Sequence, residues 1–117
     1  MIIKTEAEIK TTIPADDSIK GVQKQVLIGT EDGSDQIIMR RFIVEGGGHT
    51  PAHSHDFEHV VKIESGNGVV IDNEGHEHPV SAGNSLFIPP NEKHQFKNPH
   101  SQPFHFLCII LNPENSG

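Results

Sequence analysis

Hydrophobic residues along this chain gather in short runs that are separated by turn-forming residues. The run Gly21–Ile28 ends at Gly29, and Ile37–Val44 is followed by the triplet Gly46–Gly48. Further runs are Val60–Ile63, Val69–Ile71, His76–Val80, Ser85–Ile88, Lys93–Phe96 and Phe104–Leu111. Short runs bounded by Gly, Pro and Asn predict β-strands, and no segment has the sustained 3.6-residue apolar period of an amphipathic helix. The pattern predicts an all-β sandwich or barrel of about nine or ten strands.

Length and composition limit what this fold can be. The 117 residues suit one domain of the usual ~150 residues. The first dozen residues and the tail Pro113–Gly117 are expected to be loose. The single Cys108 excludes an internal disulfide and a cysteine-built metal site.

Charge excludes two classes of partner. Nine Lys and Arg against 16 Asp and Glu give a net charge of −7, so neither nucleic acid nor an anionic membrane is an expected partner. No apolar run approaches the ~18 residues of a membrane span, and the N-terminus lacks a signal-peptide pattern. We therefore expect a cytoplasmic protein.

Histidine is the residue in surplus, with nine copies. In an extended segment His53 and His55 project to one face, and His59 joins them if the alternation continues, which turns Glu58 away. Imidazoles spaced in this way can converge on one metal ion at ~2.0–2.1 Å. A second element follows the Pro89-Pro90-Asn91 turn, where His94 begins a strand.

The two elements together resemble the paired motifs of the cupin superfamily. The first motif, G-x5-H-x-H-x3-E-x6-G, spans 47–66 and places His59 where the family usually has glutamate. The second, G-x5-P-x-G-x2-H-x3-N, spans 83–98 and has Asn91 in place of glycine. Asparagine tolerates positive φ well. The His59 substitution is similar to that of small single-domain cupins with a four-histidine site.

This resemblance implies one cupin domain over 1–117, with the jelly-roll or double-stranded β-helix fold. It implies a divalent metal, manganese before iron, nickel, zinc or copper, and a homodimer. The implied ligands are His53, His55, His59 and His94.

Other residues are candidates for the walls of the metal cavity. Both faces of Phe104–Leu111 are apolar, which predicts a strand buried on both sides. By resemblance Phe106, Cys108 and Ile110 face the metal, and Phe96 joins them as a pocket wall. Cys108 is interpreted as a core thiol rather than a nucleophile. Arg40 is interpreted either as an anchor for a substrate carboxylate or as the partner of a surface acid. The remaining five histidines are interpreted as turn or surface residues: His49, His76, His78, His100 and His105.

Four imidazoles would leave two positions of an octahedral ion open for a small organic substrate or O₂. The leading hypothesis is therefore a metal-dependent, dioxygenase-like oxidoreductase. Among enzymes, the alternative is a Lewis-acid isomerase or hydrolase. Among proteins that are not enzymes, the alternative is a module that binds a metal or a small molecule. Both stay open because a fold alone does not decide function.

Overall fold

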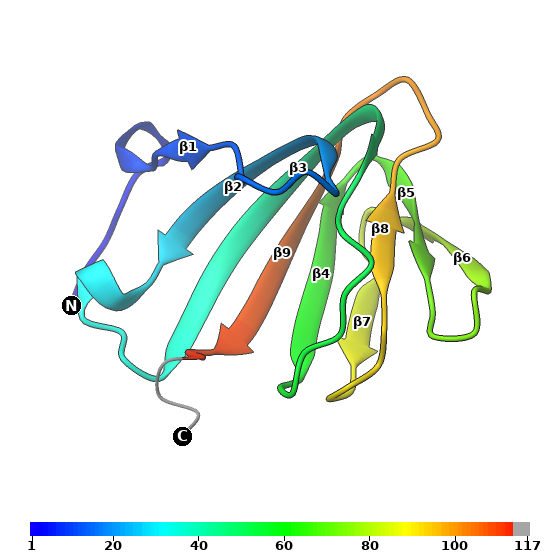
Figure 1. The fold of residues 1–117 in the computed structure, drawn as a ribbon. Coiled ribbons are helices and arrows are strands. Elements are labelled where there is room, and N and C mark those ends of the chain that lie inside the picture. Colours follow the sequence, from blue (N-terminus) through cyan, green and yellow to red (C-terminus); the bar gives the residue numbers. More distant parts are fainter. Residues whose placement is uncertain (114–117) are drawn as a thin grey trace.

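The computed structural model describes residues 1–113, in which nine antiparallel strands form one strongly curled sheet (Figure 1). The order along the sheet is β6-β5-β8-β3-β9-β4-β7, and β2 pairs with β3 and carries the short β1. The strands are β1 (Thr11–Thr12), β2 (Lys20–Ile28), β3 (Ile37–His49), β4 (His59–Ser65), β5 (Asn67–Ile71), β6 (Glu77–Ser81), β7 (Ser85–Ile88), β8 (Gln95–Lys97) and β9 (Phe104–Leu111). Two 3₁₀ turns, η1 (Glu6–Glu8) and η2 (Thr30–Asp32), are the helices of this part of the chain, and neither could cross a membrane.

The all-β prediction is confirmed, and the arrangement is that of a jelly-roll barrel. One strand is longer than predicted, because β3 continues through the glycine triplet to His49, where it pairs with Lys20 of β2 and Lys97 of β8. A Cβ atom added at Gly48 would lie 2.6 Å from the carbonyl oxygen of Lys20. Glycine at this position therefore allows close strand pairing.

The N-terminal segment also differs from expectation, since its first dozen residues are held against the barrel. β1 pairs with β2, and the carboxylate of Glu6 accepts a hydrogen bond of 3.0 Å from the Arg41 guanidinium, which also binds Glu64 at 2.7 Å. Of the tail that was expected to be loose, only Pro113 lies within the described residues.

The core fills the inside of the curl. Val44, Val61, Ile63 and Phe104 are at most 1% exposed, and Phe96 stacks on Phe106 with ring centroids 4.2 Å apart. Along β9 the even-numbered residues Phe104 to Ile110 are all buried. Their burial is the main source of stability in such a barrel.

The opposite face of β9 is partly exposed in the single chain, so the predicted burial of this strand on both sides requires another surface against it. Ile109 is 39% and Leu111 52% exposed. Ile109 lies beside Val60 of β4, and Val60 lies beside Phe87 of β7, so three exposed apolar residues form one row. A contiguous apolar strip on the outside of a sheet is typical of a surface that another protein covers.

We propose that a second copy of this chain covers this strip. Light scattering at micromolar concentration should then give about 26 kDa, twice the chain mass of 12.9 kDa. Replacing Val60 and Phe87 together by glutamate should shift the mass to that of one chain, because charges would be buried in the interface. A mass of one chain for the unmodified protein would contradict the proposal.

Candidate metal centre

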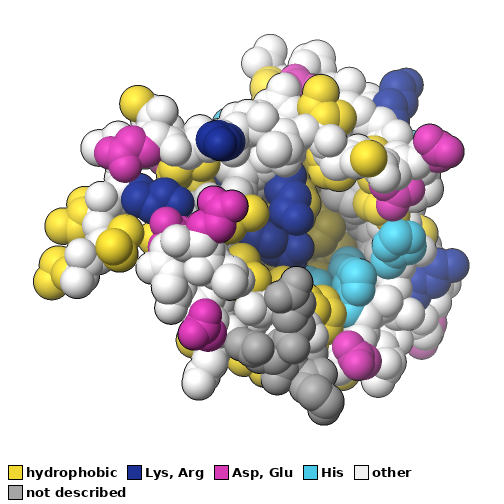
Figure 2. Space-filling model, turned by 60° about the vertical axis from the view of Figure 1, so that its left-hand side comes forward, with side chains coloured by type: hydrophobic (Ala, Val, Ile, Leu, Met, Phe, Trp, Pro, Cys, Tyr) yellow, Lys and Arg dark blue, Asp and Glu magenta, His cyan; other side chains and the backbone are white. Residues whose placement is uncertain are grey.

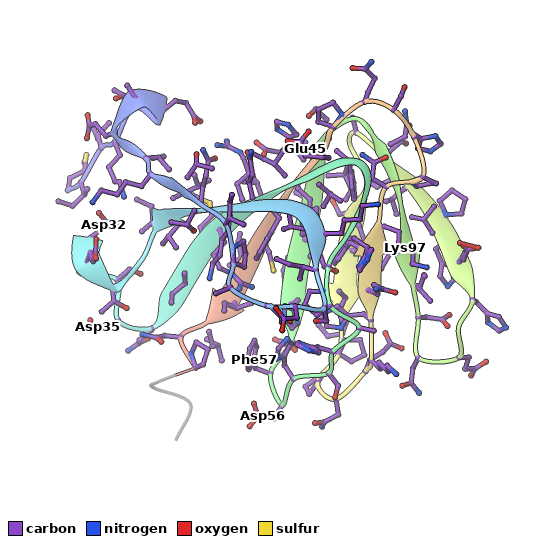
Figure 3. All side chains as sticks on the ribbon, turned by 45° about the horizontal axis from the view of Figure 1, so that its top comes forward. Asp32, Asp35, Glu45, Asp56, Phe57 and Lys97 are labelled. Carbon is purple, nitrogen blue, oxygen red and sulfur yellow. The ribbon has the colours of Figure 1, made fainter. Side chains whose placement is uncertain are left out.

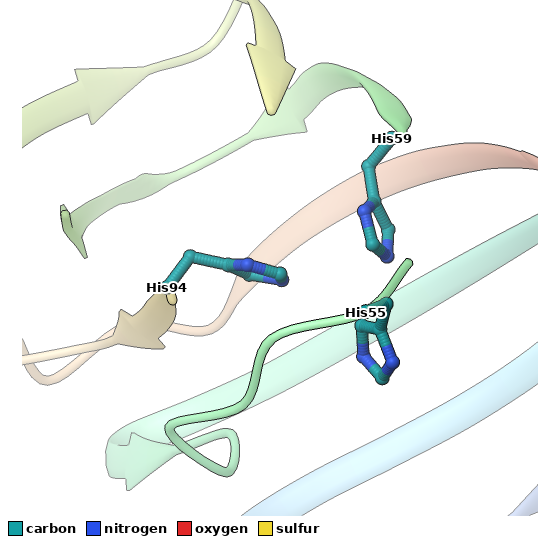
Figure 4. Close-up of side chains that lie close together, drawn as sticks. All are labelled: His55, His59 and His94. Carbon is teal, nitrogen blue, oxygen red and sulfur yellow. The ribbon is translucent and has the colours of Figure 1, made fainter. Parts of the chain in front are cut away.

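Three of the predicted histidines come together at one end of the barrel. His59 is the first residue of β4, His55 lies in the preceding loop and His94 immediately precedes β8. One ring nitrogen from each lies within 4.8 Å of those of the other two. Figure 4 shows the three rings approaching one another from three separate segments.

Backbone hydrogen bonds hold the two histidine-bearing loops against each other. His53 N donates to the His94 carbonyl at 3.1 Å, and His94 N donates back to His53 at 3.0 Å. Asn91 N donates to the His55 carbonyl at 2.6 Å. Asn91 has φ of 68°, which confirms the left-handed turn that the sequence predicted at this position. The turn that precedes β8 therefore positions His55 as well as His94.

The surroundings of the cluster favour the neutral form of His55 and His59. His59 is 5% exposed, and burial, aided by the charges of His94, His55 and Arg40, lowers its pKa to about 4. Burial is also the main cause that lowers the pKa of His55, and nearby cations add to the effect. Neutral imidazole is the form that binds metal ions.

The donor atoms fit a divalent ion. His94 Nδ1 lies 2.9 Å from the Glu92 carbonyl, which makes Nδ1 the protonated nitrogen and leaves Nε2 free to bind a metal. His59 Nδ1 is buried and has no hydrogen-bond partner among the described residues. Donors at ~2.1 Å from one ion are about 3.0 Å apart at right angles and at most about 4.2 Å apart, so the 4.8 Å limit of this cluster is only slightly wider than the span of donors around one ion. These three histidines could therefore hold a divalent ion.

The predicted fourth ligand, His53, does not belong to this cluster. Its ring centroid lies 6.1 Å from that of His55, and the side chain is exposed at the rim. The extended segment expected at His53 and His55 forms only an isolated bridge, between His53 and His94. His53 still lines the same cavity as the three clustered histidines.

Glu58, the acidic neighbour of His59, is exposed, while His59 is buried. This agrees with the prediction that Glu58 points away from the site. Asp56 in the same loop also projects outward, as Figure 3 shows. Phe57, between them, stacks on His55 with ring centroids 5.0 Å apart.

The cluster opens into a cavity of about 450 Å³ that apolar side chains line. All four residues predicted as pocket walls, Phe96, Phe106, Cys108 and Ile110, line this cavity. Burial raises the pKa of the Cys108 thiol, which agrees with its interpretation as a core thiol. Figure 2 shows the hollow, with basic side chains at its centre and histidines beside it.

Arg40 also lines the cavity, and within residues 1–113 it has no carboxylate partner. Its Nη2 lies 3.2 Å from Cys108 Sγ, and its guanidinium carbon lies 5.0 Å from the Phe42 ring centroid. The adjacent Arg41 points to the other side of the sheet, where it binds Glu6 and Glu64. Of the two interpretations that the sequence left open for Arg40, pairing with a surface acid is not seen among residues 1–113.

Sequence reasoning did not name several cavity residues, among them Lys24 and Phe42. Both follow strand alternation, since Lys24 has the parity of the buried Val22 on β2 and Phe42 has the parity of Arg40 on β3.

The pair His76 and His78, whose spacing equals that of His53 and His55, lies elsewhere. Both side chains are exposed on the β5–β6 hairpin, where His78 Nε2 lies 2.8 Å from Asp72 Oδ2. They remain outside the cavity, as expected of surface residues.

Comparison with known proteins supports the reading of the fold. The cupin domain family (Cupin_2) matches residues 40–110. Over 57% of its length this chain is 33% identical to auxin-binding protein 1 of Arabidopsis thaliana, and the match covers only 38% of the length of that protein.

Two solved structures cover most of the chain. The polyketide cyclase RemF from Streptomyces resistomycificus has a TM-score of 0.90 and 28% identity, over 95% of this chain and 79% of its own. A predicted oxalate decarboxylase from Thermotoga maritima has a TM-score of 0.82 and 25% identity, over 94% of this chain and 98% of its own. With the family match over more than half of its length, and with the histidines of both motifs gathered at one end of the barrel, this chain belongs to the cupin superfamily.

Proposed function

We propose that this protein is a metal-dependent enzyme acting on a small organic substrate. The observation that carries the proposal is the position of three imidazoles, His55, His59 and His94, in the wall of an apolar cavity. A cavity of about 450 Å³ is within the range of small-molecule sites, roughly 300–1,000 Å³. Ligands that open into such a cavity, rather than being enclosed by protein, are typical of catalytic metal sites.

His53 is proposed as a fourth ligand that joins when a metal ion is present. Its backbone is bonded to that of His94, and its side chain is exposed and lines the same cavity, so a rotation about its side-chain bonds would bring the ring toward the ion. Manganese is the proposed metal by resemblance to four-histidine cupins, but imidazole also suits iron, nickel, copper and zinc.

The remaining residues of the cavity would handle the substrate. A bound divalent ion would supply Lewis acidity and open positions for a chelating substrate. Phe96 and Phe106, which stack on each other, form an apolar wall that excludes water. Arg40 is the proposed substrate anchor, because its guanidinium faces the cavity without an acidic partner.

Two reaction types follow from this arrangement. The first is dioxygenase-like oxidation, in which substrate and O₂ react beside the ion. The second is Lewis-acid chemistry without O₂, which two observations favour: the donor set is neutral, so the ion keeps its full positive charge, and the similar RemF is a polyketide cyclase.

His59→Ala should lower metal affinity by about 100-fold or more, since even loss of a residue that only supports a ligand costs about 10–100-fold. The matched control is Glu58→Ala, one residue away and exposed, which should leave metal affinity nearly unchanged. Isothermal titration with Mn²⁺ and Zn²⁺ measures both. Loss of metal binding in Glu58→Ala with retention in His59→Ala would contradict the proposed ligand set.

Stability should depend on metal and pH together. His59 has a folded-state pKa of about 4, below the unfolded value of ~6.5. The neutral imidazole therefore contributes stability that is present above pH ~6.5 and is lost as pH falls toward 4. Metal binding adds to this effect, since it too requires neutral ligands.

Thermal melts with Mn²⁺ and with a chelator should therefore differ at pH 7.5 and converge near pH 5. His59→Gln serves as the control, because it should remove most of the difference at pH 7.5. An equal difference at both pH values in the unmodified protein would contradict the proposed coupling.

Turnover should separate the two reaction types. Metal-loaded protein is given a panel of catechols, diketones and hydroxy acids, and O₂ uptake is followed together with product formation by mass spectrometry, in air and under argon. O₂ uptake that requires His59 supports the dioxygenase-like reaction, while product formed equally under argon supports Lewis-acid chemistry. Tight binding of metal and ligand without product in either condition would make the protein a binding module.

A further inference from the structure

Two cationic side chains without acidic partners lie in the cavity wall, Lys24 of β2 and Arg40 of β3. In the register of these strands Lys24 pairs with Phe42 and Val26 with Arg40, so the two cations are diagonal neighbours. Among residues 1–113 no ion pair includes either of them. This is unusual in a chain with net charge −7, where acidic partners are abundant.

Neither cation is free in solvent. Burial is the main cause that lowers the pKa of Lys24, and the charge of Arg40 lowers it further. Arg40 Nε is fully buried without a hydrogen-bond partner, and the one hydrogen bond of its guanidinium within the described residues is the Nη2 contact with Cys108 Sγ. A guanidinium offers five N–H donors, so most of the binding capacity of Arg40 is unused.

One acidic residue, Asp16, also lines the cavity but does not neutralise the pair. Its carboxylate accepts hydrogen bonds from Ser18 N at 2.8 Å and Ser18 Oγ at 2.6 Å. The remaining side chains of the cavity are apolar, apart from Thr50 and the histidines, and Lys24 and Arg40 also line a neighbouring pocket together with Glu8, Glu31 and Asp32. Within the cavity itself two cations face one carboxylate, so its wall carries a net positive charge, and half-buried like charges side by side favour binding of an anion.

Arg40 is also close to the histidine cluster. Its charge contributes to the lowered pKa of both His55 and His59, and all three residues line the same cavity. A single small molecule in this cavity can therefore contact the histidine wall at one end and the basic wall at the other. The Phe42 and Phe106 rings, stacked with centroids 5.4 Å apart, lie along the cavity and suit a flat substrate.

We propose that Lys24 and Arg40 form an anion-binding pair, and that the substrate is a flat organic acid whose carboxylate binds this pair while its other end faces the histidines. The second half of this statement rests on the proposed metal-dependent function, whereas the anion-binding pair does not. Arginine favours carboxylate because two of its N–H groups can bind the two oxygens side by side. Lys24 adds charge without this geometry, so its contribution should be the smaller.

Matched acids and amides test the proposal. The probes are 3,4-dihydroxybenzoate and (3,4-dihydroxyphenyl)acetate, which place the carboxylate at two distances from a metal-chelating catechol, and the corresponding neutral amides. With Mn²⁺-loaded protein, isothermal titration should show at least one acid binding about tenfold more tightly than its amide. Arg40→Met should abolish this preference, and Lys24→Met should reduce it severalfold.

Lys20→Met is the control, because Lys20 lies on the same strand but is exposed and outside the cavity. It should leave the preference for the acid unchanged. Metal content is measured for every variant, and Lys24→Met and Arg40→Met should keep their metal. A preference that survives both substitutions, or equal binding of acids and amides at both lengths, would overturn the proposal.

A metal-free arm separates this proposal from the proposed function. Benzoate and benzamide are compared on chelator-treated protein by ligand-observed NMR, where benzoate should bind, weakly, and lose its binding in Arg40→Met. If the protein takes up no metal but keeps this preference, the metal-dependent function fails and the anion-binding pair stands. If it binds metal but shows no preference in either form, the anion-binding pair fails and the metal centre stands.

Discussion

The candidate site depends on the backbone pairing between two irregular segments, the loop before β4 and the turn before β8. Thr50 N donates to Phe96, His53 and His94 exchange two hydrogen bonds, and Asn91 N donates to His55. Each such bond contributes only about 0.5–1.5 kcal/mol, but together they fix two loops that carry three of the four candidate ligands. Neither segment needs to be a strand, because these bonds replace the regular ladder.

The different surroundings of the two arginines of β3, Arg40 and Arg41, follow from the alternation of side chains along a strand. Arg40 turns into the barrel and Arg41 out of it, because successive residues of a strand face opposite sides. Outside, Arg41 binds Glu6 and Glu64 and so ties the N-terminal segment to the barrel. Inside, Arg40 meets aromatic rings, a thiol and histidines. An acidic protein thereby keeps two cations, Lys24 and Arg40, in the wall of its cavity.

The barrel itself is compatible with several reactions. Similar cupins include a polyketide cyclase and a predicted oxalate decarboxylase, so a shared fold does not specify the substrate. In this chain the proposed substrate contacts are Lys24 and Arg40 by charge, and Phe42, Phe96 and Phe106 by shape. These residues come from the strands rather than from the histidine loops, so the wall can change while the histidine cluster stays the same.

Short apolar runs and turn residues were enough to predict the strands of the barrel, because both signals are local. The spacing of both motifs also predicted His55, His59 and His94, and the substitution of His59 for glutamate was visible directly. The sequence could not show that the His53 side chain stays exposed while the other three histidines cluster, because the bridge between His53 and His94 joins segments far apart in the chain. Nor could it reveal that Lys24 shares a cavity with Arg40, or that the outer face of β9 lies open in a single chain. These features depend on which strands lie side by side and on what covers each face, and only the tertiary structure decides both.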